Sequence, residues 1–426
     1  MRLLHVTAGA ANMYCGSCMR DNALASELKR MGHDVVLMPI YTPTLTDETN
    51  VSEDRVFFGG ISVYLQQKSA FFRHTPAFVD RLLFDNNWAL RKATQKSVGV
   101  DPRFLGEMTV AMLQGARGPI GKEFRKLARW VRSEEKFDVI NIPFALLIAL
   151  AEPLKRAGKT KIVCTLQGED LFLEGLIEPY KSEAIALIRA GLPHVDRFIA
   201  VSRYYANFMT GYLGIPKEKI RVAPIGISLN DYEPKPKPAR DVCKIGFFAR
   251  MDPAKGFHHL AEAYRKLREM TDLPPLRLEA AGYMLTEHKE YFEKEKALLR
   301  AAGFGNEFVY HGALTREEKT KFLQDVDILC VPTQYVEPKG LFVLEALANG
   351  TPIVLPAHGA FPEILSRTGG GILYPPGDAT ALVESLHTMI CDKERRDLMA
   401  VEAAANVRTY YSAAAMAAAH LDAYNG

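Results

Sequence analysis

Short apolar segments alternate with longer segments of helical periodicity along two stretches of the chain. The first stretch predicts strands at 2–7, 34–39, 138–142, 161–166, 197–201 and 220–224. The second predicts strands at 243–248, 276–281, 308–311, 328–331, 352–355 and 372–374. Strands separated by helices predict βαβ units and a parallel sheet. Continuously apolar strands such as 198–201 predict helices on both faces of that sheet.

A proline-rich, charged segment at 233–241 separates the two stretches. Its alternate prolines exclude both helix and ladder pairing, and its charges predict a solvated linker. We therefore expect an N-terminal domain at 1–232 and a C-terminal domain at 242–408. The fold class is α/β, with two doubly wound, Rossmann-like domains and a ligand cleft between the carboxyl ends of their strands.

One segment, about 42–132, interrupts the alternation and is rich in aromatic residues. It ends in a basic amphipathic stretch at 122–132. Two interpretations are open. The aromatic residues of this helical insertion pack into a small core of their own. Alternatively, the insertion is an acceptor-binding lid or a membrane-surface helix, in which case 122–132 makes a peripheral membrane contact.

Composition and charge narrow the class of protein. The chain has 426 residues, of which 48% are hydrophobic and 24% charged, so disorder is excluded as its main state. A net charge of +3 argues against a dedicated nucleic-acid binder. The apolar run at the N-terminus is too short for a signal peptide, and six cysteines are few, so we expect a cytoplasmic location.

Two cations follow the first predicted strand of the C-terminal domain. Arg250 comes directly after that strand, and Lys255 comes just before the next predicted helix. Two positive charges beside a helix N-terminus form a suitable place for a diphosphate. An arginine and a lysine in a solvated turn would give the same pattern, and the spacing alone does not separate the two interpretations.

Two carboxylates, Glu337 and Glu345, flank the start of a later predicted helix in the segment Glu337–Gly350. Gly340 permits close approach of a ligand, and the amides of Leu341 and Phe342 point out of the helix N-terminus. Glu345 lies among apolar neighbours, where a carboxylate is costly unless it is paired. A ribose diol would supply two donors. Alternatively, Glu337 complements the helix dipole and Glu345 is a surface charge.

Together, the Arg250/Lys255 loop and the Glu337-x7-Glu345 segment resemble the retaining glycosyltransferases of the GT-B fold, family 4. The stretches 204–231 and 358–363 also resemble this family. The resemblance covers most of 1–40 and 134–426. It implies transfer of a sugar from a nucleotide-diphosphate donor to a glycan, lipid or small-molecule acceptor. It also implies that the N-terminal domain faces the acceptor and that a last helix at 409–426 crosses back to that domain.

The resemblance also assigns roles to individual residues. Arg250, Lys255 and Glu337 would be catalytic: the two cations would hold the diphosphate, and Glu337 would contact the transferred sugar. Glu345 would accept hydrogen bonds from the ribose. The other implied substrate-binding residues are Gly16, Gln167, Lys339, Gly340, Leu341 and Phe342. The family's mechanism requires no metal and no cofactor beyond the donor itself.

The chain departs from the family pattern at two positions. Gln167 and Asn141 stand where the family commonly carries histidine. Amide side chains donate hydrogen bonds to a sugar but cannot accept a proton. Either hydrogen bonding is the function of these positions, or the acceptor has changed or activity has been lost. The alternative to an enzyme is therefore a non-catalytic module, derived from this fold, that binds a sugar nucleotide or a glycan. An epimerase is disfavoured because the N-terminal domain lacks the ionisable bases it would need.

Cys15 and Cys18 have the spacing of a redox dithiol just before a predicted helix. They lie in the loop after the first strand, which the resemblance places near the donor. No second pair completes a zinc site. We therefore do not assign them a redox or metal function.

Overall fold

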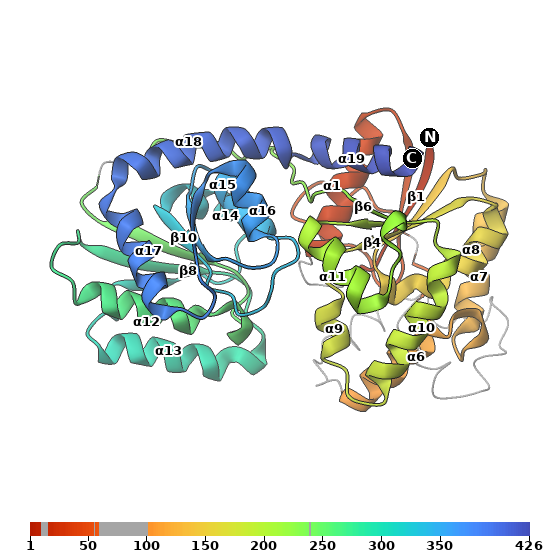
Figure 1. Ribbon diagram of the computed structural model, residues 1–426, viewed down its shortest axis with the longest axis horizontal. Helices are drawn as coiled ribbons and strands as arrows, with labels where there is room; N and C mark the ends of the chain where they lie inside the picture. The colour runs from red at the N-terminus through yellow and green to blue at the C-terminus, as the bar shows by residue number, and fades with distance from the viewer. Residues whose placement is uncertain (10–15, 55, 59–100, 238–239) are drawn as a thin grey trace. The chain divides into compact units, whose positions relative to one another are not determined.

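The computed structural model describes residues 1–9, 16–54, 56–58, 101–237 and 240–426. The chain divides into two compact units (Figure 1). Unit 1 comprises Met1–Pro224 and Ala417–Gly426, and unit 2 comprises Ile225–Met416. Each unit contains a six-stranded sheet whose neighbouring strands are parallel. The predicted α/β class with two Rossmann-like domains is confirmed.

The sheet of unit 1 has the strand order β2-β1-β3-β4-β5-β6. Its strands are β1 (Arg2–Thr7), β2 (Asp34–Pro39), β3 (Val139–Ile142), β4 (Lys161–Leu166), β5 (Arg197–Ala200) and β6 (Ile220–Val222). Almost every residue of β3 and β4 is buried, as continuous apolar strands require. The order changes direction between β1 and β3, so the loops after these two strands flank a ligand-binding position of the fold.

Helices connect these strands and cover the sheet. Those of unit 1 are α1 (Gly16–Arg30), α6 (Pro102–Leu113), α7 (Gly121–Ser133), α8 (Ala151–Gly158), α9 (Asp170–Glu174), α10 (Tyr180–Gly191) and α11 (Arg203–Leu213). The basic stretch predicted at 122–132 forms most of α7. Its apolar side is buried in unit 1, where Phe124 packs edge-to-face on Phe58 with ring centres 5.1 Å apart. Arg125 and Arg129 are exposed on the other side. The apolar side of α7 therefore packs within unit 1. The central part of the predicted insertion, 59–100, lies outside the described residues.

The sheet of unit 2 has the strand order β12-β11-β10-β7-β8-β9. Its strands are β7 (Cys243–Phe248), β8 (Leu276–Ala281), β9 (Phe308–Tyr310), β10 (Ile328–Cys330), β11 (Ile353–Pro356) and β12 (Gly371–Tyr374). Its helices are α12 (Phe257–Arg268), α13 (Lys289–Ala301), α14 (Arg316–Asp325), α15 (Leu341–Ala348), α16 (Phe361–Thr368), α17 (Ala379–Cys391) and α18 (Lys393–Tyr410). Here the order reverses between β7 and β10, so the loops after these strands flank the expected ligand position.

The chain enters unit 2 directly after Pro224, ahead of the proline-rich segment. Ile227 exchanges backbone hydrogen bonds with Tyr411 and Ala413 at 2.9 and 2.8 Å. The Tyr232 hydroxyl donates to Glu345 at 3.1 Å. These contacts attach the residues before 233 to unit 2, which moves the division of the chain to Pro224.

Lys237 shows that the proline-rich segment is not a freely solvated linker. Its ammonium donates to three carbonyls at the end of α14, those of Leu323, Gln324 and Val326, and to Thr351 Oγ1 at 2.9 Å. A cation there complements the negative end of the helix dipole. Burial lowers the pKa of Lys237 to about 8, although the charge of Asp327 opposes that shift.

The last helix, α19 (Ala413–Asn425), is divided between the two units, and its residues from Ala417 onward belong to unit 1. Within unit 1, Lys161 Nζ donates to the carbonyl of Tyr424 at 2.6 Å. Arg197 Nη1 donates to the carbonyl of Ala423 at 2.9 Å. These bonds satisfy carbonyls at the C-terminus of the helix, where no further turn can accept them.

Within the described residues, no helix combines the length and the apolar character needed to cross a bilayer.

We expect Lys237→Met to lower the free energy of unfolding by about 1–3 kcal/mol, because it removes a charged donor from part-buried carbonyls at the end of α14. The matched control is Lys235→Met, which removes an exposed charge from the same segment. Urea denaturation followed by circular dichroism measures both. Equal effects of the two variants would show that Lys237 does not hold this segment in place.

Candidate functional site

Two loops of unit 2 meet where its strand order reverses. The loop after β7 carries Arg250 and Lys255, and the loop after β10 carries Glu337. Gly256 ends the first loop with φ +78°, and a Cβ there would lie 2.0 Å from the carbonyl oxygen of Pro332. Only glycine permits this close approach of the two loops. The predicted cations and the first predicted carboxylate are thus brought to the carboxyl end of one sheet.

Lys255 and Glu337 form a shielded ion pair. Lys255 Nζ donates to Glu337 Oε2 at 2.7 Å, and the side chains are 16% and 8% exposed. Burial alone would raise the pKa of Glu337. The positive charges of Lys255 and Lys339, with the hydrogen bond from Lys255, outweigh burial and hold that pKa below its ordinary value. The carboxylate is therefore ionised at neutral pH.

The N-terminus of α15 adjoins this pair. Gly340 precedes the helix in a left-handed conformation, with φ +68°, and its backbone nitrogen lies 3.5 Å from Glu337 Oε1. The N-cap residue is a glycine and has no side chain to cap the helix, so, among the described residues, the amides of Leu341 and Phe342 keep their donor capacity at the positive end of the dipole. Lys255 Nζ also lies 5.9 Å from the centre of the Phe342 ring. The arrangement has the charge and the donors needed to hold an anion.

Glu345 is buried inside α15, as its apolar neighbours predict, but it has protein partners that sequence reasoning missed. Lys319 Nζ donates to Glu345 Oε1 at 2.7 Å, and the Tyr232 hydroxyl donates to the same oxygen at 3.1 Å. Lys319 and Tyr232 come from α14 and from the segment before β7. The carboxylate therefore does not need a ribose to offset its burial. Both bonds end on Oε1, so a ligand would use Oε2.

Arg250 lies at the same edge but is paired within its own loop. Its guanidinium contacts Asp252 Oδ2 at 2.9 Å, and the arginine side chain is 46% exposed. Asp252 also accepts a hydrogen bond from the Ala254 amide at 3.0 Å through Oδ1 and so caps the short turn that presents Lys255. Sequence reasoning did not single out Asp252. The exposed arginine can exchange this surface partner for a ligand at little cost.

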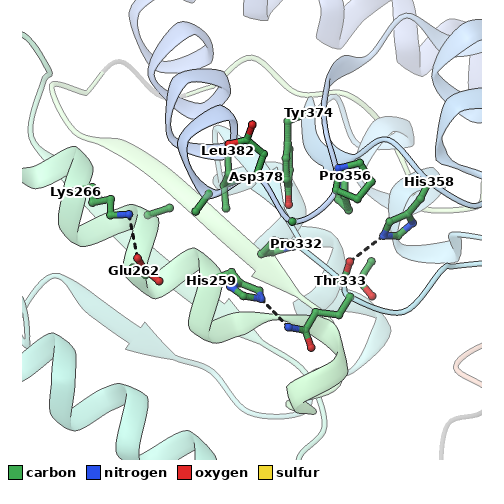
Figure 2. A pocket seen from close by; sticks show the side chains of 15 residues that line it. His259, Glu262, Lys266, Pro332, Thr333, Pro356, His358, Tyr374, Asp378 and Leu382 are labelled. Carbon is green, nitrogen blue, oxygen red and sulfur yellow. Dashed lines mark hydrogen bonds and ion pairs between the residues drawn. The ribbon is translucent and has the colours of Figure 1, made fainter.

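A cavity of about 530 Å³ opens beside these loops, between α12 and the first turn of α17 (Figure 2). Its volume lies in the range of small-molecule pockets. Thr333, Pro356 and Tyr374, labelled in Figure 2, line it, each at or just beyond the carboxyl end of a strand. His358 Nε2 contacts the carbonyl of Thr333 at 2.9 Å. None of the predicted donor residues lines this cavity.

In unit 1, Gln167 follows β4 and is 3% exposed. Its Nε2 donates to the carbonyl of Pro143 at 2.8 Å, while its buried Oε1 has no hydrogen-bond partner in the part of the chain that the structure describes. Asn141 Oδ1 accepts from Thr165 Oγ1 at 2.9 Å. Gly16 is the first residue of α1, and the loop before it, 10–15, lies outside the described residues, as does Cys15. Cys18 is buried in α1.

A carboxylate that the sequence did not reveal, Glu169, organises the loops after β3 and β4. It accepts backbone hydrogen bonds from Ala145, Gln167 and Gly168 at 2.8–3.0 Å, and one from the Tyr205 hydroxyl at 3.1 Å. Burial raises the pKa of Glu169, and these hydrogen bonds offset only part of that rise. Glu169 thus fixes the backbone that presents Gln167.

Two family models match the chain. "Glycosyl transferases group 1" matches residues 231–406, and "Glycosyltransferase Family 4" matches residues 107–231. The amylovoran biosynthesis glycosyltransferase AmsK of Erwinia amylovora is 24% identical over 58% of this chain and 60% of its own length. The matched part thus spans about 60% of that relative.

Two solved structures share the fold over the whole chain. Sucrose-phosphate synthase from Thermosynechococcus elongatus has a TM-score of 0.71 at 15% identity and covers 100% of this chain and 98% of its own. Anabaena HepE, solved with UDP, has a TM-score of 0.68 at 16% identity and covers 100% of both chains. These likenesses and the two parallel-sheet units show the GT-B fold. The two family models, which together match 107–406, show that the chain belongs to the group 1 glycosyltransferases.

Proposed function

We propose that the protein transfers a sugar, with retention of anomeric configuration, from a nucleoside-diphosphate donor to a glycan, lipid or small-molecule acceptor. The observation that carries this proposal is the Lys255–Glu337 ion pair beside the uncapped N-terminus of α15. The pair lies where a doubly wound sheet binds its ligand. Complexes of HepE with UDP and with UDP-glucose support a donor of this class.

In the proposed reaction, the bond between the anomeric carbon and the diphosphate oxygen breaks. Negative charge then develops on the departing diphosphate. Lys255, Arg250 and the first amides of α15 stabilise that charge, and Lys339 adds a further positive charge nearby. The acceptor hydroxyl oxygen attacks the same face of the sugar, and its proton passes to the departing phosphate. This sequence requires neither a protein base nor a metal ion.

The two buried glutamates have different proposed roles. Glu337 is held ionised by Lys255 and accepts hydrogen bonds from hydroxyls of the transferred sugar. Glu345 is held through Oε1 by Lys319 and Tyr232 and presents Oε2 to the ribose hydroxyls. In both cases the protein cation fixes the carboxylate before the donor arrives, which reduces the ordering cost of binding.

Unit 1 supplies the proposed acceptor contacts. The buried Oε1 of Gln167 can accept a hydrogen bond from a sugar hydroxyl. Gly16, at the start of the helix after the first loop, has a different proposed role, which is to allow close contact with the donor diphosphate. Neither Gln167 nor Asn141 can accept a proton, which favours a non-catalytic sugar-nucleotide or glycan-binding module as the second candidate. Turnover distinguishes the two candidates, because a module binds nucleotide without transferring the sugar.

We expect Lys255→Ala and Glu337→Gln each to lower the rate of sugar transfer by about 10²–10³, since each removes a charge aimed at the reacting donor. The assay follows release of UDP, GDP or ADP from the corresponding sugar donors in the presence of a mixed acceptor pool. Lys321→Ala is the control, because Lys321 pairs only with exposed partners on the surface of α14. If the wild type binds nucleotide but shows no turnover with any donor and acceptor, the module is the correct function.

The depressed pKa of Glu337 predicts how its contribution to stability depends on pH. This contribution is present above the unfolded value of about 4.5 and is lost as the pH falls through the lower folded value. The difference in unfolding free energy between wild type and Glu337→Gln should therefore stay constant from pH 8 to about pH 5 and shrink below it. A wild type that gains stability relative to Glu337→Gln as the pH falls from 7 to 5 would mean that burial, not Lys255, dominates at Glu337, because a raised pKa makes the folded state take up the proton first.

A further inference from the structure

Three side chains of types that can ligate a metal, an imidazole, a thiol and a carboxylate, lie close together on the surface of unit 2. His387 and Cys391 lie one turn apart on α17, and Asp272 lies in the connection between α12 and β8. His387 Nε2 is 2.8 Å from Asp272 Oδ2 and 3.7 Å from Cys391 Sγ. One donor atom from each of the three residues lies within 4.8 Å of the other two. The cluster shares no residue with the proposed donor site or with the cavity in Figure 2.

The geometry distinguishes a metal site from a proton relay. In a relay, the thiol and the carboxylate use opposite nitrogens of the imidazole ring. Here the carboxylate contacts Nε2, and Sγ is also nearer to Nε2, at 3.7 Å, than to Nδ1, at 4.0 Å. Nε2 is therefore the ring nitrogen nearer to both the carboxylate and the thiol. Bonds of about 2.0–2.3 Å to a tetrahedral zinc ion place neighbouring donors roughly 3.3–3.8 Å apart, so modest side-chain rotations suffice.

The donor set favours zinc among the divalent ions. Thiolate and imidazole are ligands that suit zinc better than magnesium or calcium, and zinc also binds carboxylate oxygens. Three protein ligands leave a fourth position for water. The side chains of His387 and Asp272 are 31% and 62% exposed, so an ion can enter from solution.

The position of the cluster indicates which segments of unit 2 a bound ion would join. Helix α12 and the first turn of α17 line the cavity in Figure 2. The cluster joins the end of α17 to the connection that follows the end of α12. We propose that Asp272, His387 and Cys391 bind a zinc ion that ties the C-terminal end of α17 to the connection that follows α12. The ion takes no part in sugar transfer.

Binding requires loss of the Cys391 thiol proton, because the thiolate is the ligand. The ion therefore displaces a proton on binding, and its affinity should rise with pH.

Cobalt(II) is the probe, because a thiolate ligand gives it a charge-transfer band in the near ultraviolet. We expect the reduced, chelator-treated full chain to bind about one equivalent of Co²⁺ with this band and to release the ion when zinc is added. Cys391→Ser should abolish the band. His387→Gln should weaken binding of zinc and of cobalt by at least about tenfold, and Asp272→Asn by a smaller factor.

Two control variants make the result specific. Glu384→Gln removes an exposed carboxylate from the same helix and should leave the band intact. Cys15→Ser removes the Cys15-x-x-Cys18 pair and should also leave it intact. Zinc should raise the melting temperature of the wild type and of both controls, but not that of Cys391→Ser. Absence of a stoichiometric band, its persistence in Cys391→Ser, or its loss in Cys15→Ser would overturn the proposal. None of these results depends on glycosyl transfer, so they test the ion independently of the proposed function.

Discussion

A buried carboxylate that remains charged is the central constraint in unit 2. Glu337 is 6% exposed, and the charge of Lys255 at 2.7 Å keeps it ionised. Buried ion pairs add little net stability, because desolvation offsets most of their attraction. This pair also lies where the strand order reverses, at the edge where ligands bind in doubly wound sheets. The presence of a pair that adds little stability, and its position at the ligand-binding edge, are both explained if the pair is arranged to bind a charged ligand.

The same construction recurs at three carboxylates. Lys255 holds Glu337, Lys319 and Tyr232 hold Glu345, and backbone amides with Tyr205 hold Glu169. In each case, groups from a different element fix the orientation of the carboxylate before any ligand is present. A site built this way loses little side-chain entropy on binding. It also makes each carboxylate dependent on its partner, because removal of one partner leaves a buried charge uncompensated.

The sequence predicted most of the fold because the strands are continuous apolar runs bounded by helices. Those at 161–166, 243–248 and 276–281 match the structure residue for residue. The connection between β3 and β4 begins as a 3-10 helix, Ala145–Leu150, and becomes α-helical at Ala151. Pro153 is tolerated there because it lies in the first α-helical turn.

At the site, the loop positions of Lys255 and Glu337 were predictable from local pattern, whereas the partners of Glu345 were not. Lys319 and Tyr232 are 26 and 113 residues away from Glu345 in sequence. No periodicity or local spacing reports such a pairing. The capping of α14 by Lys237 was hidden for the same reason, since charge and proline content favoured a solvated linker. These features depend on which elements the tertiary fold brings together.

The central claim is that unit 2 binds the donor diphosphate at Lys255 and the start of α15. A crystal structure of the protein with a nucleoside diphosphate sugar tests it most directly. The account predicts diphosphate oxygens within hydrogen-bond distance of Lys255 Nζ and of the first amides of α15, with the ribose at Glu345. A donor whose diphosphate lies in the cavity of Figure 2, or whose sugar lies away from Glu337, would contradict the account.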